Sequence, residues 1–163
     1  MKRVASFALL LSLGGCGLQP LYQGGGSGKV ATMLSSVEVS PIKGQDGWLM
    51  ANALRDRLGS DGTANRYRLD VTLDDSIIGL GVRRDDSITR ERRTLRARYR
   101  LTDTSSGLVI MDATAGSDAG IDVVGSEYAT IAAERSALER LSGIVADQIV
   151  ANLAVYAREA PAP

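Results

Sequence analysis

Alternation of polar and apolar residues over 89–102 constrains the fold of this chain more than any other feature of its sequence. Successive side chains of a β-strand point to opposite faces, so a period of two residues predicts a strand with one buried face. The odd positions include the apolar residues and most even positions are arginine: Leu95, Ala97, Tyr99 and Leu101 against Arg90, Arg92, Arg96, Arg98 and Arg100. We therefore predict a long strand with one apolar and one strongly basic face, and Arg93 lies on the apolar side.

Three further strands are predicted around this one. Residues 67–74 alternate strictly between polar and apolar, and residues 37–40 form a short alternating run that ends before Pro41. Polar residues and a glycine over 103–107 predict a turn, after which residues 108–114 return as the second strand of a hairpin. We expect a loop rich in glycine and charge over 77–87 and irregular structure over 116–125.

Two helices are predicted from apolar residues at spacings of three and four. The first covers 46–58, with Asp46 as its N-cap and Gly59 as its stop, and the second covers 126–156, with Ser126 as its N-cap. The order strand, helix, three strands, helix predicts an α+β fold, and the first two strands should run parallel through a right-handed crossover. We therefore expect a two-layer sandwich with two helices packed on one face of a mixed four-stranded sheet.

The N-terminus has the features of a secretory signal peptide. Lys2 and Arg3 precede a short apolar run, and Leu13-Gly14-Gly15-Cys16 follows it. This arrangement resembles a lipobox, which implies cleavage before Cys16 and acylation of its thiol and amine; the alternative is an ordinary signal peptide beside an incidental cysteine. Gly17 stands where aspartate would resemble an inner-membrane retention signal, so the resemblance implies the periplasmic face of the outer membrane.

These features divide the chain into four parts. Residues 1–15 are the expected signal peptide and residues 16–34 a lipidated flexible tether that contains Gly24-Gly25-Gly26-Ser27-Gly28. Residues 35–157 are the expected α+β domain and residues 158–163 a disordered tail.

Composition excludes several classes of function. The 163 residues contain no histidine and one cysteine, which removes Ser-His-Asp and Cys-His catalysis and makes the usual zinc sites improbable. The 19 basic and 19 acidic residues become 17 and 19 when Lys2 and Arg3 leave with the signal peptide, a net charge of −2 that does not suggest nucleic-acid binding. We expect no enzyme activity, no catalytic residue, no metal and no cofactor.

The chain resembles the LptE family of lipopolysaccharide-assembly lipoproteins in its alphaproteobacterial form. Four pieces in order carry the resemblance: Gly15-Cys16-Gly17-Leu18-Gln19-Pro20-Leu21-Tyr22, Tyr67-Arg68-Leu69-Asp70-Val71-Thr72-Leu73, the strand from Thr89-Arg90 to Arg98-Tyr99-Arg100-Leu101, and Glu127-Tyr128-Ala129-Thr130. The resemblance implies a non-catalytic lipoprotein that plugs the outer-membrane barrel LptD, assists its assembly and contacts lipopolysaccharide. The competing hypotheses are a stand-alone periplasmic lipid- or glycan-binding lipoprotein and a lipoprotein enzyme.

The basic residues of the long strand and the loop before it are the candidate binding residues: Arg83, Arg84, Arg90, Arg92, Arg96, Arg98 and Arg100. Guanidinium groups bind phosphate in a bidentate manner, so we expect this face to bind lipopolysaccharide or an acidic wall of LptD. The alternative is a solvated sheet face whose charge is balanced across the strands by Asp70 and Asp74.

Three other features have less specific interpretations. The apolar residues Ile77, Ile78, Leu80 and Val82 of the expected loop suggest a contact surface. Asp74-Asp75 and Asp85-Asp86 do not suggest an acid/base pair, because adjacent strand residues point to opposite faces and no nucleophile accompanies them. Trp48 is expected to be a core or interface anchor.

Overall fold

A four-stranded mixed sheet in the order β1-β2-β3-β4 forms one layer of the described part of the chain. The computed structural model describes residues 28–59, 66–82, 88–123 and 125–159. The strands are β1 (Val37–Val39), β2 (Tyr67–Val82), β3 (Ile88–Asp103) and β4 (Val109–Asp122). β1 pairs parallel with β2, and the β2–β3 and β3–β4 pairs are antiparallel. The predicted parallel first pair and the predicted hairpin are both confirmed.

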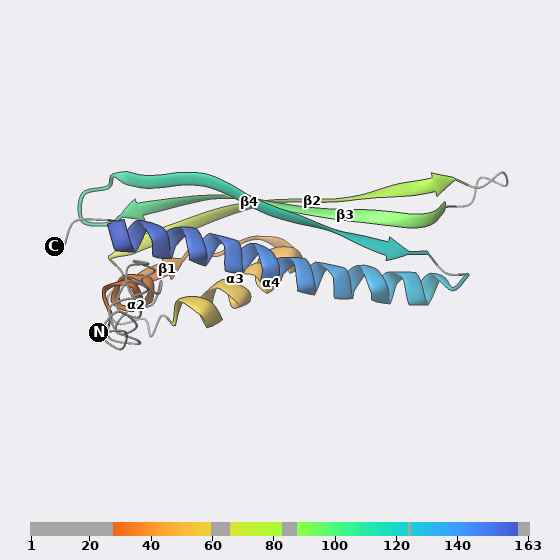
Figure 1. Cartoon of the computed structure of the whole chain (residues 1–163), viewed down its shortest axis with the longest axis horizontal. Helices are drawn as coiled ribbons and strands as arrows, with labels where there is room; N and C mark the ends of the chain where they lie inside the picture. The colour runs from red at the N-terminus through yellow and green to blue at the C-terminus, as the bar shows by residue number, and fades with distance from the viewer. Residues whose placement is uncertain (1–27, 60–65, 83–87, 124, 160–163) are drawn as a thin grey trace, which may run out of the picture.

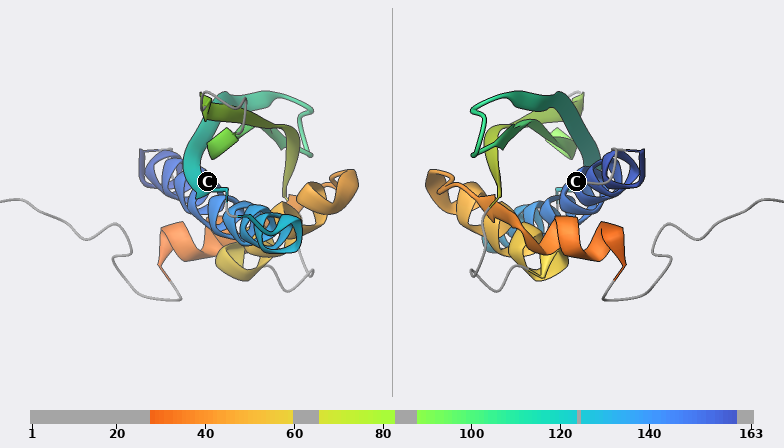
Figure 2. Two further views of the ribbon diagram at one scale, coloured as in Figure 1. Left: turned by 90° about the vertical axis from the view of Figure 1, so that its right-hand side faces the viewer. Right: turned by 90° about the vertical axis from the view of Figure 1, so that its left-hand side faces the viewer.

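The helices form the second layer. They are α2 (Lys29–Ser35), α3 (Gly44–Leu58) and α4 (Glu127–Glu159), and all three lie on the concave side of a sheet that curves over α4 (Figures 1 and 2). The predicted α+β class, with helices on one face of a mixed sheet, is confirmed. None of the helices among the described residues is long and apolar enough to cross a membrane.

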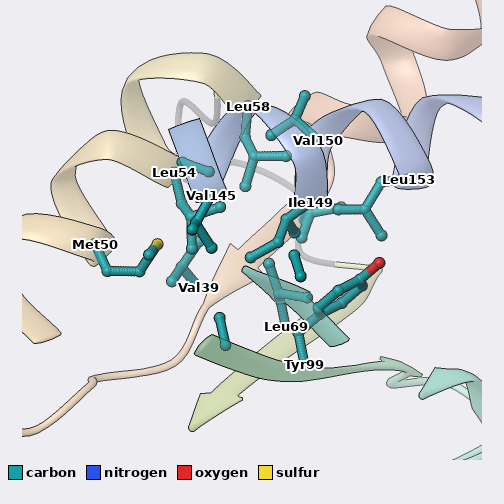
Figure 3. Close-up of a cluster of buried hydrophobic side chains, with 14 of the residues drawn as sticks. Val39, Met50, Leu54, Leu58, Leu69, Tyr99, Val145, Ile149, Val150 and Leu153 are labelled. Carbon is teal, nitrogen blue, oxygen red and sulfur yellow. The ribbon is translucent and has the colours of Figure 1, made fainter. Parts of the chain in front are cut away.

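The period of two residues along β3 separates the core from the solvent. The odd residues Leu95, Ala97, Tyr99 and Leu101 are buried against the helices, and the even arginines are exposed. Figure 3 shows Leu69 and Tyr99 of the sheet beneath Leu54 of α3 and Ile149 of α4. The hydroxyl of Tyr99 accepts a hydrogen bond of 2.8 Å from Nδ2 of Asn152, which satisfies the one polar atom of this aromatic side chain.

Helix α4 determines the long dimension of the domain. Its 33 residues correspond to about 50 Å at 1.5 Å per residue. Ser126 precedes its first turn, and the backbone N–H of Ala129 donates to Oγ of Ser126 at 3.5 Å, as expected for the predicted N-cap. Its fully buried side chains begin at Ala137, so its first turns cover the far end of the sheet with little apolar burial.

Helix α3 begins two residues earlier than predicted. Lys43 is the residue before its first turn, so the prediction of Asp46 as the N-cap is wrong, and Asp46 lies within the first turn. A carboxylate there still interacts favourably with the positive end of the helix dipole. The predicted stop is confirmed, because Gly59 has φ 64° and donates its N–H to the carbonyl of Arg55 at 3.2 Å.

The sequence-based expectation of a flexible tether as far as residue 34 is wrong. Residues 29–35 form α2, and its Val30 and Leu34 are buried in the core beside α4. Seven residues are too few to show a helical period, and packing rather than propensity stabilises a helix this short. The described residues therefore contain α2 in addition to the two expected helices, and at the other end α4 includes residues 158 and 159 of the expected tail.

Both expected loops beside the long hairpin are largely strand. Residues 77–82 continue β2 and residues 116–122 continue β4, and each segment pairs with β3. Glycines and adjacent apolar residues hide the alternation in these segments, but a long neighbouring strand supplies backbone hydrogen bonds that override local preference. Residues 83–87 lie outside the described residues.

The packing of α2 is testable by truncating Leu34, whose side chain is 3% exposed. We expect Leu34→Ala to lower the free energy of unfolding by about 2–5 kcal/mol, because it leaves a cavity in the core. Thr32→Ala, at an exposed position of the same helix, should change it by less than about 0.5 kcal/mol. Urea unfolding followed by circular dichroism measures both, and equal effects would contradict the packing of α2.

Candidate functional site: the arginine face of the sheet

Five exposed arginines cover the outer side of β3, away from the helices. We call Arg90, Arg92, Arg96, Arg98 and Arg100 the arginine face. The odd residues of β3 are buried under α3 and α4, so the alternation of the strand holds every one of these side chains on the convex surface. The predicted clustering of these five residues on one face is confirmed.

Aspartates of β4 neutralise part of the arginine face. Asp112 lies opposite Arg100, and it accepts hydrogen bonds of 3.0 Å from Nε and Nη2 of Arg98 and of 3.2 Å from Nη2 of Arg100. Asp122 lies opposite Arg90 and accepts from its Nε at 3.0 Å. The guanidinium groups of Arg98 and Arg100 hold the pKa of Asp112 below its ordinary value, so this carboxylate stays ionised well into the acid range.

The predicted charge partners on β2 do not fill this role. Asp70 accepts a hydrogen bond of 2.6 Å from Oγ of Ser40 and one of 3.4 Å from Nε of Arg68. Asp74 lies opposite Arg96 in the register but forms no ion pair with it. The alternative interpretation is therefore wrong in its residues, because aspartates of β4 rather than Asp70 and Asp74 balance Arg90, Arg98 and Arg100.

Arg92 and Arg96 make no ion pair with any residue in the described ranges. Each lies opposite a glycine of β4, Gly120 and Gly116 respectively, whereas Arg90 and Arg100 lie opposite aspartates and Arg98 opposite Thr114. The side chain of Arg96 occupies the space above Gly116, since a Cβ atom there would lie 2.5 Å from its Cδ. These two guanidinium groups therefore keep their donors available to a ligand.

A hollow of about 440 Å³ lies at one end of the arginine face. Leu80, Thr89, Arg90 and Asp122 line it, so the ion pair between Arg90 and Asp122 forms part of its wall. An apolar side chain beside an ion pair suits an amphipathic molecule better than a small polar metabolite.

Arg93 has a different role because it lies on the helix-facing side of β3. Its guanidinium group pairs with the carboxylate of Asp75 and donates Nη1 to the main-chain oxygen of Glu134 in α4 at 2.8 Å. Hydrogen bonding to Asp75 raises the pKa of Arg93 above its ordinary value. This arginine links the sheet to the first turns of α4, where few apolar side chains are buried, and is unavailable to a ligand.

The other sequence candidates are dispersed. Cys16, Arg83 and Arg84 lie outside the described residues. Asp74 and Asp75 point to opposite faces of β2, as predicted, and no group of acidic side chains suited to a metal occurs among the residues that the structure describes.

The exposed apolar candidates lie on two elements, α3 and β2. Trp48 is 63% exposed on α3, which excludes it from the core and leaves a contact role as its predicted function. Ile77 and Ile78 are exposed as well, but they are strand residues rather than a loop tip.

The aspartates and glycines of β4 were missed by sequence reasoning. A signal for them exists, because Asp112, Thr114, Gly116, Asp118, Gly120 and Asp122 occupy alternate positions. It was hidden because alanine and serine occupy most of the intervening positions, where large apolar residues would have revealed a strand.

The Asp112 pairs predict a specific dependence of stability on pH. A carboxyl group whose pKa is lowered by folding contributes stability above its unfolded pKa of about 3.9, and this contribution disappears as the pH falls through the folded pKa. Asp112→Asn should therefore be less stable than the native chain at pH 6, and the difference should shrink toward pH 2. Urea unfolding across this range measures it, with Asp118→Asn, which removes an exposed carboxylate without an ion pair in the described region, as the control. A difference that stays constant with pH would contradict the assignment.

Solved structures of bacterial lipoproteins share this fold. A candidate lipoprotein from Caulobacter crescentus CB15 superposes with a TM-score of 0.70 at 26% sequence identity, over 82% of this chain and 100% of that chain. Rare lipoprotein B from Shewanella oneidensis has a TM-score of 0.57 at 12% identity, over 72% and 95%. A minor lipoprotein from Acinetobacter baumannii has a TM-score of 0.56 at 16% identity, over 73% and 88%. The last two likenesses concern the fold alone.

The sequence comparison is more specific than the structural one. No curated protein matches the chain. Residues 34–153 match the family described as LptE, lipopolysaccharide-assembly, and this range includes all four strands, α3 and most of α4. Because the match covers most of the 163 residues and ends within the same domain that the structure describes, this chain belongs to the LptE family of lipopolysaccharide-assembly proteins.

Proposed function

We propose that this chain is an outer-membrane lipoprotein of the lipopolysaccharide translocon, held at the periplasmic face by acyl chains on Cys16. In this role it plugs the LptD barrel, assists the assembly of that barrel and contacts lipopolysaccharide during its insertion into the outer leaflet. Family membership supports the assembly role, and the sequence Leu13-Gly14-Gly15-Cys16 supports the anchor. The role is one of binding and positioning and requires no catalytic residue.

The shape of the domain supports the plug. Helix α4 and the hairpin of β2 and β3 run along the same axis (Figure 1), and α4 alone spans about 50 Å. The hydrocarbon layer of a bilayer is about 30 Å thick, so a domain of this length can lie inside a barrel with both ends beyond that layer. Its polar outer face suits the interior of such a barrel, which is polar.

The lipopolysaccharide contact rests on the guanidinium groups of Arg92 and Arg96, which form no ion pair with any residue that the structure describes. Lipid A presents phosphates, and arginine binds phosphate through paired N–H donors. Arg90, Arg98 and Arg100 have aspartate partners already, so a ligand would have to compete with these ion pairs. We therefore expect Arg92 and Arg96 to contribute more to binding than their three neighbours.

Single substitutions test this division of the arginine face. Arg92→Gln and Arg96→Gln should each weaken lipopolysaccharide binding by about tenfold or more, because a hydrogen bond to a charged group contributes about 1.5–3 kcal/mol. Arg90→Gln, which removes an arginine with an aspartate partner, is the matched control and should have a smaller effect. Binding of purified protein to immobilised lipopolysaccharide measures all three, after circular dichroism has confirmed folding. If the folded Arg92 and Arg96 variants bind lipopolysaccharide as before but no longer bind the barrel, the arginine face contacts the LptD wall instead.

Co-purification tests the proposed partner. Tagged full-length protein should emerge from detergent-solubilised membranes together with a large β-barrel, and Cys16→Ala should remove it from the membrane fraction. Recovery of the lipidated protein without such a barrel would favour a stand-alone lipid- or glycan-binding lipoprotein.

A further inference from the structure

One edge of the sheet is paired over only a fraction of its length. β1 pairs with β2 from Tyr67 to Leu69, and the N–H of Ser40 then donates to the carbonyl of Leu69 at 3.0 Å. β2 continues to Val82, but no backbone hydrogen bond between described residues reaches its outward edge beyond Leu69. This leaves an open strand edge that is much longer than β1.

The hydrogen bonds to β1 identify the groups along this edge. Tyr67 and Leu69 direct their backbone groups toward β1, since the N–H of Tyr67 donates to the carbonyl of Ser36 at 3.1 Å. Backbone direction alternates along a strand, so the later odd residues present their N–H and C=O groups to the open edge. They are Val71, Leu73, Asp75, Ile77 and Gly79. Their side chains lie on the helix-facing side, where Val71 and Leu73 are half-buried and Ile77 is 40% exposed.

The other edge of the sheet is protected. Helix α4 packs along β4, and the backbone N–H of Gly116, which faces away from β3, donates to Oε1 of Gln148 at 3.1 Å. Proteins otherwise protect sheet edges with lysine, proline or a covering helix. β2 has no lysine, arginine or proline from Val71 to Val82, so its edge lacks these protecting residues.

We propose that the open edge of β2 receives an extended strand from a partner protein, in line with β1, as an additional strand of the sheet. The unpaired backbone groups specify an extended segment, because only a strand can bond to alternate residues over this length. Apolar side chains of the partner strand would lie beside Leu73 and Ile77, and basic ones beside Asp74 on the opposite face. Asp74 is available for this contact because Arg96, its neighbour in the register, extends over Gly116 instead.

Charge argues against a second copy of this chain as the occupant. Residues 70–82 contain no basic residue, and Asp74 forms no ion pair with a described residue, so pairing of two β2 edges would bring uncompensated Asp74 charges to the new interface. The partner strand should instead be basic or neutral. This inference goes beyond the proposed function, because it does not depend on which protein supplies the strand.

Amide hydrogen exchange of the full-length protein tests the edge. The protein is extracted in detergent from its native membranes and compared with the same chain produced alone in cells that lack its partners. Exchange over residues 71–79 should be slower in the native extract by about tenfold or more, because backbone pairing protects amides. Ile77→Pro should abolish the difference, since it removes an outward N–H while the bonds to β3 come from the even residues.

Two further variants keep the test interpretable. Ile77→Lys places a charge at the edge without a change to the backbone, and it should also abolish the protection if the proline variant fails to fold. Thr114→Pro is the matched control, because it removes an outward N–H from the opposite edge, and it should leave the protection of β2 intact.

Each outcome decides the proposal. If a barrel is present in the extract but the amides of residues 71–79 are not protected, the proposal of an added strand is rejected and the proposed function is retained. Protection without a barrel supports the strand and rejects LptD as its source, whereas absence of both rejects both. Protection that appears in the chain produced alone and rises with its concentration would assign the edge to a second copy and overturn the proposal.

Discussion

Strand β3 is the constraint on which the rest of the structure depends. Among the strands that the structure describes, it alone pairs along both sides for almost its whole length, and its odd residues form the sheet side of the core. A shift of its register by one residue would move the arginine face into the core and Leu95, Ala97, Tyr99 and Leu101 into solvent. Burial of Leu95, Ala97, Tyr99 and Leu101 therefore determines the position of the arginine face as firmly as it determines the fold.

The parts of the fold that were predictable are those in which one strand or helix displays its own pattern. β3 and the first half of β2 alternate clearly, and α4 shows an apolar stripe, because each of these buries one face against a large neighbour. Helix α2 and the far halves of β2 and β4 have no such pattern. α2 is too short for a period, and Gly116 and Gly120 become strand residues because the residues on either side of them in β4 bond to β3. Their structure is a property of the assembled sheet rather than of the local sequence.

The position of the arginine face was predictable, but the ion pairs that its arginines form were not. Alternation placed five arginines on one face, yet their partners depend on the register between β3 and β4, which is set by the turn and by an irregularity at Leu101 and Thr102. The same register places Asp112 near two arginines and glycines opposite Arg92 and Arg96. Glycine has no side chain, so Gly116 leaves room for the side chain of Arg96 and Gly120 leaves open space beside Arg92, which composition alone does not reveal.

The packing of α2 against α4 shortens the segment that connects the folded domain to its proposed membrane anchor. If Cys16 carries the acyl chains, as we propose, the segment from the anchor to Lys29 spans no more than about 45 Å even when fully extended. An unstructured segment as far as residue 34 would have had a longer reach from the anchor. A shorter linker confines the domain to a smaller volume above the bilayer and so raises its effective concentration toward partners in the same membrane. Two buried side chains of a short helix thereby influence how often the protein meets its partner, without any contact to that partner.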